Sequence, residues 1–163
     1  MQEIIKIDTP NETYLTNLDF ECYILNSSLD DDYCTSFINN ANKKNKIVLF
    51  YGENAPQKAQ QFGASGVVVD LGDDKLKTKF EALQKSLTKN SIIGLFSRSR
   101  RHEAMLISEL EPDFIIFKVW QDGIEKTQEL LNWYNDFFII QSCAWLEDKN
   151  IDTSQINTYF IIY

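Results

Sequence analysis

The chain is poor in the residues that build metal sites and disulfide frameworks, with one histidine and three cysteines among 163 residues. Cys22, Cys34 and Cys143 have no metal-ligand spacing, and a single histidine far from them leaves no set of zinc ligands. An odd number of thiols without a disulfide pattern is typical of a reducing compartment. We therefore expect reduced thiols and a cytoplasmic protein.

Long hydrophobic runs and excess positive charge are also missing. No run approaches the roughly 18 apolar residues of a membrane span, and the first residues lack the apolar stretch of a signal peptide. The formal net charge of −8 disfavours general affinity for nucleic acid or for anionic membrane surfaces. We expect neither as a partner.

What the chain does contain indicates a folded protein. Hydrophobic residues make up 44% and aromatic residues 13%, and no low-complexity segment or linker divides the sequence. A length of 163 residues is enough for a hydrophobic core. We therefore predict a single domain spanning residues 1–163.

Apolar runs alternate with helical patterns along the whole chain. The eight runs predicted as strands are residues 4–7, 20–25, 47–51, 66–71, 92–96, 114–119, 137–140 and 158–163. Capping boxes predict helix starts at Thr9, with Glu12, and at Asp122, with Glu125. A helix opening at Asp73 has the clearest helical periodicity, and another opens near Ser99 or Arg100. Residues 147–157 are only weakly helical.

Several of these runs are continuously apolar, as expected for strands covered on both faces. Alternating strand–helix units indicate a parallel sheet with right-handed crossovers. Eight units predict a small (β/α)8 TIM barrel with short helices and no final helix after the eighth strand. The alternative is an open doubly wound α/β sheet in which two of the weaker runs are not strands.

All three arginines and the only histidine fall within five consecutive residues directly after the fifth apolar run. Arginine presents a rigid fork of donors that matches phosphate or carboxylate, and a helix N-terminus adds free backbone N–H groups. This loop is therefore a candidate anion site, and its alternative is a solvated charged loop. The phosphate-binding candidates are Ser97, Arg98, Ser99, Arg100, Arg101, His102 and Lys118.

Four segments resemble the thiamine phosphate synthase family, in its TenI-type and divergent bacterial branches. They are residues 63–67 (Gly-Ala-Ser-Gly-Val), 93–97 (Ile-Gly-Leu-Phe-Ser), 101–105 (Arg-His-Glu-Ala-Met) and 111–115 (Glu-Pro-Asp-Phe-Ile). The resemblance covers about residues 45–145. It implies a TIM barrel and a transferase of thiamine biosynthesis that joins a pyrimidine pyrophosphate to a thiazole phosphate with Mg²⁺.

The chain departs from this family at most catalytic positions. Glu53 and Asn54 stand where the family has an Asn-Asp pair, and no glycine pair follows the seventh predicted strand. The resemblance leaves Asp70 and Asp73 as candidate Mg²⁺ ligands, although acidic residues that open a helix are also ordinary capping residues. No catalytic residue is assigned. Polar residues are also expected at the carboxyl ends of the other strands, namely Asp8, Asn26, Tyr51, Gln141 and Ser142.

Three functions follow from these observations. The first is a thiamine phosphate synthase-like barrel that binds a small phosphorylated ligand, with catalysis lost or altered. The second is an active, divergent, Mg²⁺-dependent synthase. The third is a non-enzymatic α/β interaction or scaffold protein. Without a last helix, Phe160, Ile161 and Ile162 are expected to form an uncovered apolar strip. We predict that a second copy of the chain, in a homodimer, or another protein covers this side.

Overall fold

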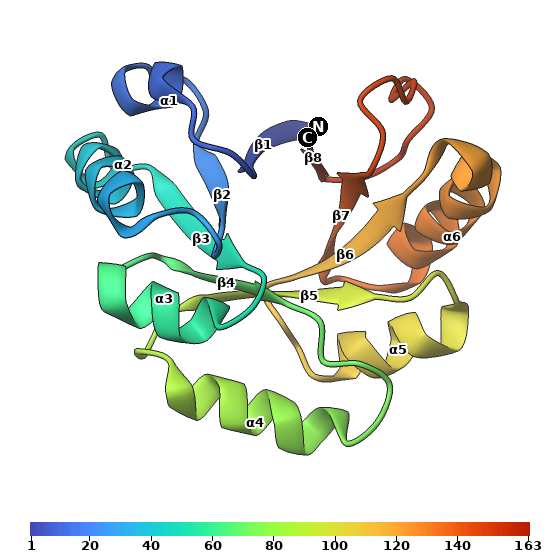
Figure 1. Cartoon of the computed structure of the whole chain (residues 1–163). Coiled ribbons are helices and arrows are strands. Elements are labelled where there is room, and N and C mark those ends of the chain that lie inside the picture. Colours follow the sequence, from blue (N-terminus) through green and yellow to red (C-terminus); the bar gives the residue numbers. More distant parts are fainter. The chain divides into compact units, whose positions relative to one another are not determined.

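The computed structural model describes all 163 residues and contains eight parallel strands that close into a barrel in the order β1 to β8 (Figure 1). The strands are β1 (Gln2–Ile7), β2 (Cys22–Asn26), β3 (Ile47–Tyr51), β4 (Gly66–Val69), β5 (Ile92–Ser97), β6 (Phe114–Val119), β7 (Gln141–Leu146) and β8 (Phe160–Ile162). The predicted TIM barrel is confirmed, and the open doubly wound sheet is wrong.

Helices occupy most of the connections between strands. They are α1 (Glu12–Thr16), α2 (Asp31–Lys43), α3 (Ala55–Phe62), α4 (Leu76–Ser86), α5 (Arg101–Glu109) and α6 (Ile124–Phe137), with a short 3-10 turn, η1 (Gln121–Gly123), before α6. The connection between β7 and β8 contains no helix. None of the helices combines the length and the hydrophobicity that a membrane-spanning helix requires.

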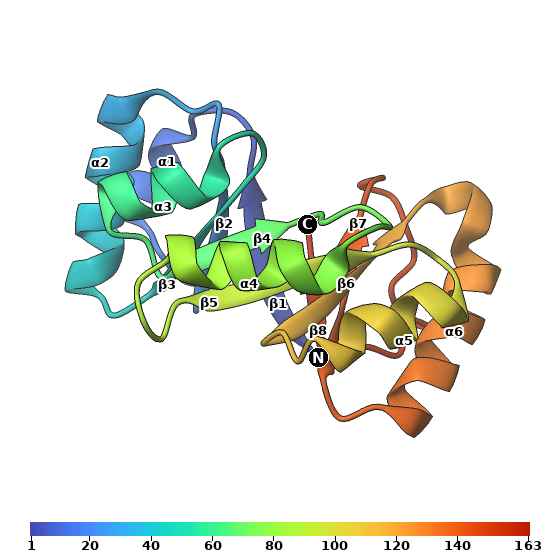
Figure 2. The ribbon, with the colours of Figure 1, turned by 90° about the horizontal axis from the view of Figure 1, so that it is seen from below.

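The chain forms two compact units, which we describe separately. The first comprises residues 4–69 and 81–92, and the second comprises residues 1–3, 70–80 and 93–163. In the first unit, α2 and α3 lie on one face of β3 (Figures 1 and 2). In the second unit, α5 and α6 pack on β6, which also pairs with both β5 and β7.

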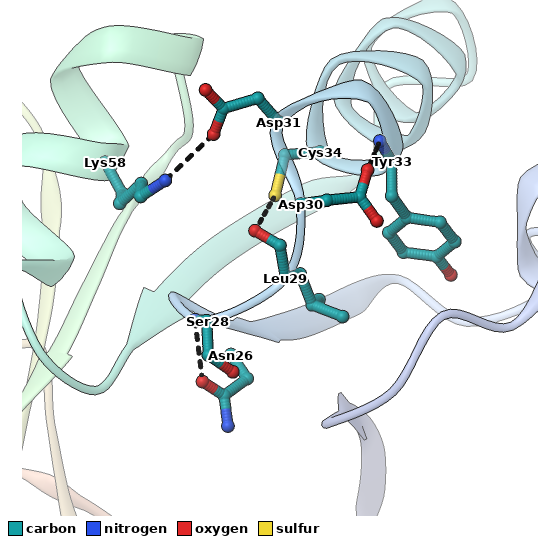
Figure 3. Close-up of polar contacts among 8 residues, drawn as sticks. All are labelled: Asn26, Ser28, Leu29, Asp30, Asp31, Tyr33, Cys34 and Lys58. Carbon is teal, nitrogen blue, oxygen red and sulfur yellow. Dashed lines mark hydrogen bonds and ion pairs between the residues drawn. The ribbon is translucent and has the colours of Figure 1, made fainter.

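Capping and ion pairs fix the corner between β2 and α2 in the first unit (Figure 3). The Asp30 carboxylate accepts a hydrogen bond from the Tyr33 backbone N–H at 2.8 Å, which makes Asp30 the N-cap of α2. Asp31 pairs with Lys58 of α3 at 3.0 Å. The Cys34 thiol donates to the Leu29 carbonyl oxygen at 3.8 Å. This acidic run therefore starts and anchors a helix.

An aromatic cluster holds α5 and α6 against β6 in the second unit. The Tyr134 ring stacks on Phe138 with centroids 4.8 Å apart and meets Phe117 of β6 edge-on at 5.4 Å. The Tyr134 hydroxyl is 2.9 Å from the hydroxyl of Ser108 on α5. Since Phe117 and Tyr134 are fully buried and Ser108 lies in the last turn of α5, this cluster fixes the carboxyl-terminal part of α5 against β6.

The prediction of a strand at residues 137–140 is wrong. Phe137 is the last residue of α6, and the following residues form a loop in which Ile139 is 96% exposed. The strand is Gln141–Leu146, whose residues from Ser142 onward are buried. The prediction placed the strand on the apolar residues, but these lie in an exposed loop, and the strand itself begins with polar residues. Gln141 and Ser142 therefore begin β7 and do not lie at its carboxyl end.

Three predicted helix starts also need correction. The N-cap of α1 is Asn11 in place of Thr9, and its side chain accepts from the Thr13 backbone N–H at 3.0 Å. Gly123, and not Asp122, is the N-cap of α6, because η1 takes up the preceding residues. Helix α4 begins at Leu76 and not at Asp73.

Candidate functional site

A cavity of about 230 Å³ lies within the second unit at the carboxyl ends of β5 and β6. In a TIM barrel, this end of the strands is where binding sites are built. The polar lining residues are Asp70, Asp73, Ser97, Arg98, Ser99, Glu103 and Lys118, and the apolar ones are Leu76, Phe96, Leu106, Ile107 and Trp120. The cavity therefore combines charged groups with a substantial apolar wall.

Arg98 is the arginine of the cluster that lines the cavity. Its Nη1 atom lies 3.5 Å from Oδ2 of Asp73, and both side chains are more than half exposed. Ser97, the last residue of β5, is buried, and its hydroxyl donates to the Arg98 carbonyl oxygen at 3.0 Å. Ser99 follows on the same wall. This loop can therefore present a guanidinium and a hydroxyl to a ligand.

The other members of the cluster do not line the cavity. Arg100 is the N-cap residue of α5, with an extended backbone and no capping hydrogen bond from its side chain. The guanidinium of Arg101 lies 5.1 Å from the centre of the Trp133 ring on α6, a cation–π contact. His102 is exposed in the first turn of α5. The structure thus separates Arg98 from its sequence neighbours.

Lys118 contributes a second cation to the cavity. It is the one residue of β6 that is partly exposed. Its ammonium group lies 3.4 Å from Oε1 of Glu147. The same group lies 5.2 Å from the centre of the Phe96 ring. Lys118 is thus held between a carboxylate and an aromatic face, beside the space that a ligand would fill.

Asp70 and Asp73 both line the cavity without forming a metal site by themselves. The Asp70 carboxylate accepts the backbone N–H of Gly72 at 2.9 Å, in a turn where Gly72 has a φ of 77°. Asp73 is paired with Arg98. No group of three or more acidic, histidine or cysteine side chains lies where it could hold a metal ion. The residues present therefore do not fit a preformed Mg²⁺ site.

Asp74, next to this pair, has its own partner. A hydrogen bond from Lys79 at 2.8 Å and the charge of that ammonium group lower the pKa of the Asp74 carboxyl. Lys79 also donates to the Leu71 carbonyl oxygen at 2.9 Å. Asp74 therefore stabilises the turn before α4 and does not line the cavity.

Sequence reasoning missed Glu103, Phe96 and Trp120 as cavity residues. Trp120 follows β6 directly and lines the cavity, and it is 50% exposed, which is unusual for a tryptophan. Glu103 is the third residue of α5, and a carboxylate in the first turn of a helix is common because it interacts favourably with the helix dipole. Only its position after folding distinguishes it from such a residue.

The strand ends of the first unit form a separate polar network. The Asn26 amide donates to Oδ1 of Asp8 and to the Tyr51 hydroxyl, both at 3.2 Å, and its oxygen accepts the Ser28 backbone N–H at 2.9 Å. Lys6 lies 3.6 Å from Asp8. Since Asn26 uses both its donors and its acceptor within the chain, this network is satisfied without a ligand.

No family model matches the sequence, and no curated protein gives a significant sequence match. Solved structures do match in fold. Thiamine phosphate pyrophosphorylase from Pyrococcus furiosus has a TM-score of 0.73 at 12% identity, and the match covers 99% of this chain and 83% of that protein.

Two other enzymes show how widely this fold is shared. Tryptophan synthase from M. tuberculosis has a TM-score of 0.68 at 10% identity, with 99% of this chain and 81% of that one covered. Phosphoenolpyruvate phosphomutase from Streptomyces platensis subsp. rosaceus has a TM-score of 0.66 at 10% identity, with 100% and 76% covered. The chain therefore has a TIM-barrel fold similar to that of thiamine phosphate pyrophosphorylase, which confirms the predicted resemblance at the level of the fold.

Proposed function

We propose that this chain binds a small phosphorylated ligand in the cavity at the carboxyl ends of β5 and β6, with catalysis lost or altered. The observation that carries the proposal is the position of Arg98, which lines the cavity beside Ser97 and Ser99 directly before α5. A guanidinium matches phosphate oxygens in a two-pronged geometry, and a hydroxyl supplies a further donor.

Two further features support an anionic ligand. The amino-terminal turn of α5 has no side-chain cap, so its backbone N–H groups are available for an acceptor. Lys118 supplies a second positive charge from the adjacent strand. Arg100, Arg101 and His102 remain candidates for attracting an anion to the loop at longer range, although they do not line the cavity.

An active Mg²⁺-dependent synthase is the second candidate function. Asp70 and Asp73 lie on the same wall as Arg98, and Mg²⁺ is often held by one or two carboxylates together with substrate phosphates. On this alternative, the metal would bind only with the phosphorylated ligand, since no protein-only site is formed. A Mg²⁺ requirement for phosphate or pyrophosphate binding would favour it.

The test is calorimetric titration with inorganic phosphate and pyrophosphate at low salt, with and without Mg²⁺. We expect Arg98→Ala to weaken binding by at least about tenfold, because charge-assisted hydrogen bonds to phosphate are lost. Arg100→Ala removes the same charge from a neighbouring residue outside the cavity and should keep most of the affinity. No heat with either anion, or equal loss in both variants, would contradict the proposal and favour a scaffold role.

A further inference from the structure

Glu103 has an oxygen that nothing in the chain satisfies. Its Oε2 atom is buried and has no hydrogen-bond partner, the only buried side-chain nitrogen or oxygen atom in this condition. Glu103 lies in the first turn of α5 and lines the same cavity as Arg98 and Lys118. An unpaired, buried polar atom on a residue that lines a cavity calls for an explanation.

The two cations of the cavity do not pair with this oxygen. The guanidinium of Arg98 is paired with Asp73 at 3.5 Å, and the ammonium group of Lys118 is paired with Glu147 at 3.4 Å. A carboxylate oxygen that loses water without gaining a donor is costly, and a charged donor compensates best. The chain itself therefore supplies no donor to this oxygen, and a ligand in the cavity reaches it only when the Glu103 side chain turns toward the cavity.

The cavity also offers a surface that attracts cations. Trp120 is half exposed on its wall, and the indole ring is the strongest cation–π partner among side chains. Phe96 already receives the Lys118 ammonium group over its ring at 5.2 Å. A carboxylate and an aromatic face lining one small cavity are the features that bind an ammonium group.

We propose that the ligand is zwitterionic, a phosphate monoester that also carries an ammonium group. The proposal rests on the phosphate-binding function argued above, and it adds Glu103 and Trp120 as the residues that select for the amine. The phosphate would lie against Arg98 and the start of α5, and the ammonium group would pair with Glu103. A volume of about 230 Å³ limits the ligand to a few atoms beyond these two groups.

The experiment compares O-phosphoethanolamine with n-propyl phosphate, which replaces the ammonium group by a methyl group of similar size. Both are titrated into the wild-type chain and into Glu103→Gln, Arg98→Ala and Glu109→Gln. Glu109 ends the same helix, is exposed and does not line the cavity, so its variant controls for the loss of one carboxylate from α5. Circular dichroism confirms that each variant is folded.

We expect the wild-type chain and Glu109→Gln to prefer O-phosphoethanolamine by about tenfold or more. Glu103→Gln should lose this preference while it keeps its affinity for n-propyl phosphate, and Arg98→Ala should weaken both ligands. Equal wild-type affinities for the two ligands, with both weakened by Arg98→Ala, would overturn the zwitterion proposal and leave phosphate binding intact. Binding of neither ligand would contradict the phosphate-binding function itself.

Discussion

Arg98, directly after β5, lies 3.5 Å from Asp73, which precedes α4, so the only arginine of the cavity is already paired with a carboxylate. This ion pair leads to opposite expectations for the two candidate functions. If Arg98 binds phosphate alone, Asp73 competes with the ligand for the guanidinium. If Asp73 holds Mg²⁺ with the ligand, it contributes to binding.

The Asp73→Asn variant separates these possibilities. For metal-free phosphate binding we expect it to raise the affinity by up to about fivefold, since an exposed ion pair is worth up to about 1 kcal/mol. Asp74→Asn, at a neighbouring carboxylate that pairs with Lys79 outside the cavity, serves as the control. The measurement is calorimetric titration with pyrophosphate at low salt. A loss of Mg²⁺-dependent binding in Asp73→Asn would support the synthase alternative.

Replacing Glu103 by methionine should stabilise the empty protein. Methionine has a similar length and removes the unsatisfied oxygen, at the loss of a favourable interaction with the α5 dipole. We expect the free energy of unfolding in urea to rise by about 1 kcal/mol, as at other binding sites where function opposes stability. A destabilised Glu103→Met variant would indicate that the carboxylate has a structural partner in solution.

Gly66 should tolerate no side chain. A Cβ atom at this position would collide with the backbone of Ile92, including its carbonyl oxygen. Because backbone atoms cannot rotate away, Gly66→Ala should lower the free energy of unfolding by about 3 kcal/mol or more. Gly123→Ala is the matched control, since no atom lies within 4 Å of its added Cβ and only the capping preference of glycine is lost. Urea unfolding curves should therefore separate the two variants clearly.

Stability should fall at alkaline pH because of two thiols, those of the buried Cys34 and the partly buried Cys22. Burial raises the pKa of Cys22 from the ordinary 9.0 to about 12 and that of Cys34 to about 11. The folded state thus keeps these protons while the unfolded state releases them above pH 9, so stability is intact below that pH and is lost as the pH rises toward 12.

Urea unfolding from about pH 8 to pH 11 tests this linkage. The Cys22→Ala/Cys34→Ala variant should lose less stability over this range than the wild type. Burial also raises the pKa values of Tyr23, Tyr33 and Tyr134, so part of the alkaline loss should remain in the variant. Identical pH profiles for the two proteins would rule out a contribution from the thiols.

The homodimer through the strand-eight side stays a prediction. The expected uncovered apolar strip is wrong for Ile161 and Ile162, which are buried within the chain. Phe160 in part, Tyr159 at 49% and Tyr163 at 39% form the exposed aromatic surface there. Sedimentation should give twice the chain mass of 19.0 kDa at high protein concentration. Tyr159→Lys should shift the protein to the monomer, whereas Ile139→Lys, in the loop before β7, should not. A monomer at all concentrations would contradict the prediction.

The barrel was predictable from the chain because its strands are short, continuously apolar and separated by helical periodicity. Residues 115–117 of β6 are fully buried, as such a run requires. The seventh strand was misplaced because Ile139 and its neighbours are apolar yet lie in an exposed loop. Local hydrophobicity indicates which residues can be buried, but the packing of the whole chain determines which of them are buried.

In the candidate site, too, part of the arrangement was visible in the sequence and part was decided by tertiary packing. Clustered arginines after a strand were visible in the sequence, and the loop that carries them borders the cavity. Folding then turns Arg98 to the cavity wall and brings Arg101 over the ring of Trp133. Glu103 gives no sequence signal, because an acidic residue in the first turn of a helix is ordinary. Helix α5 packs on β6 through Tyr134 and Phe117 and so brings Glu103 to the cavity wall. Only this packing shields the unpaired oxygen from water.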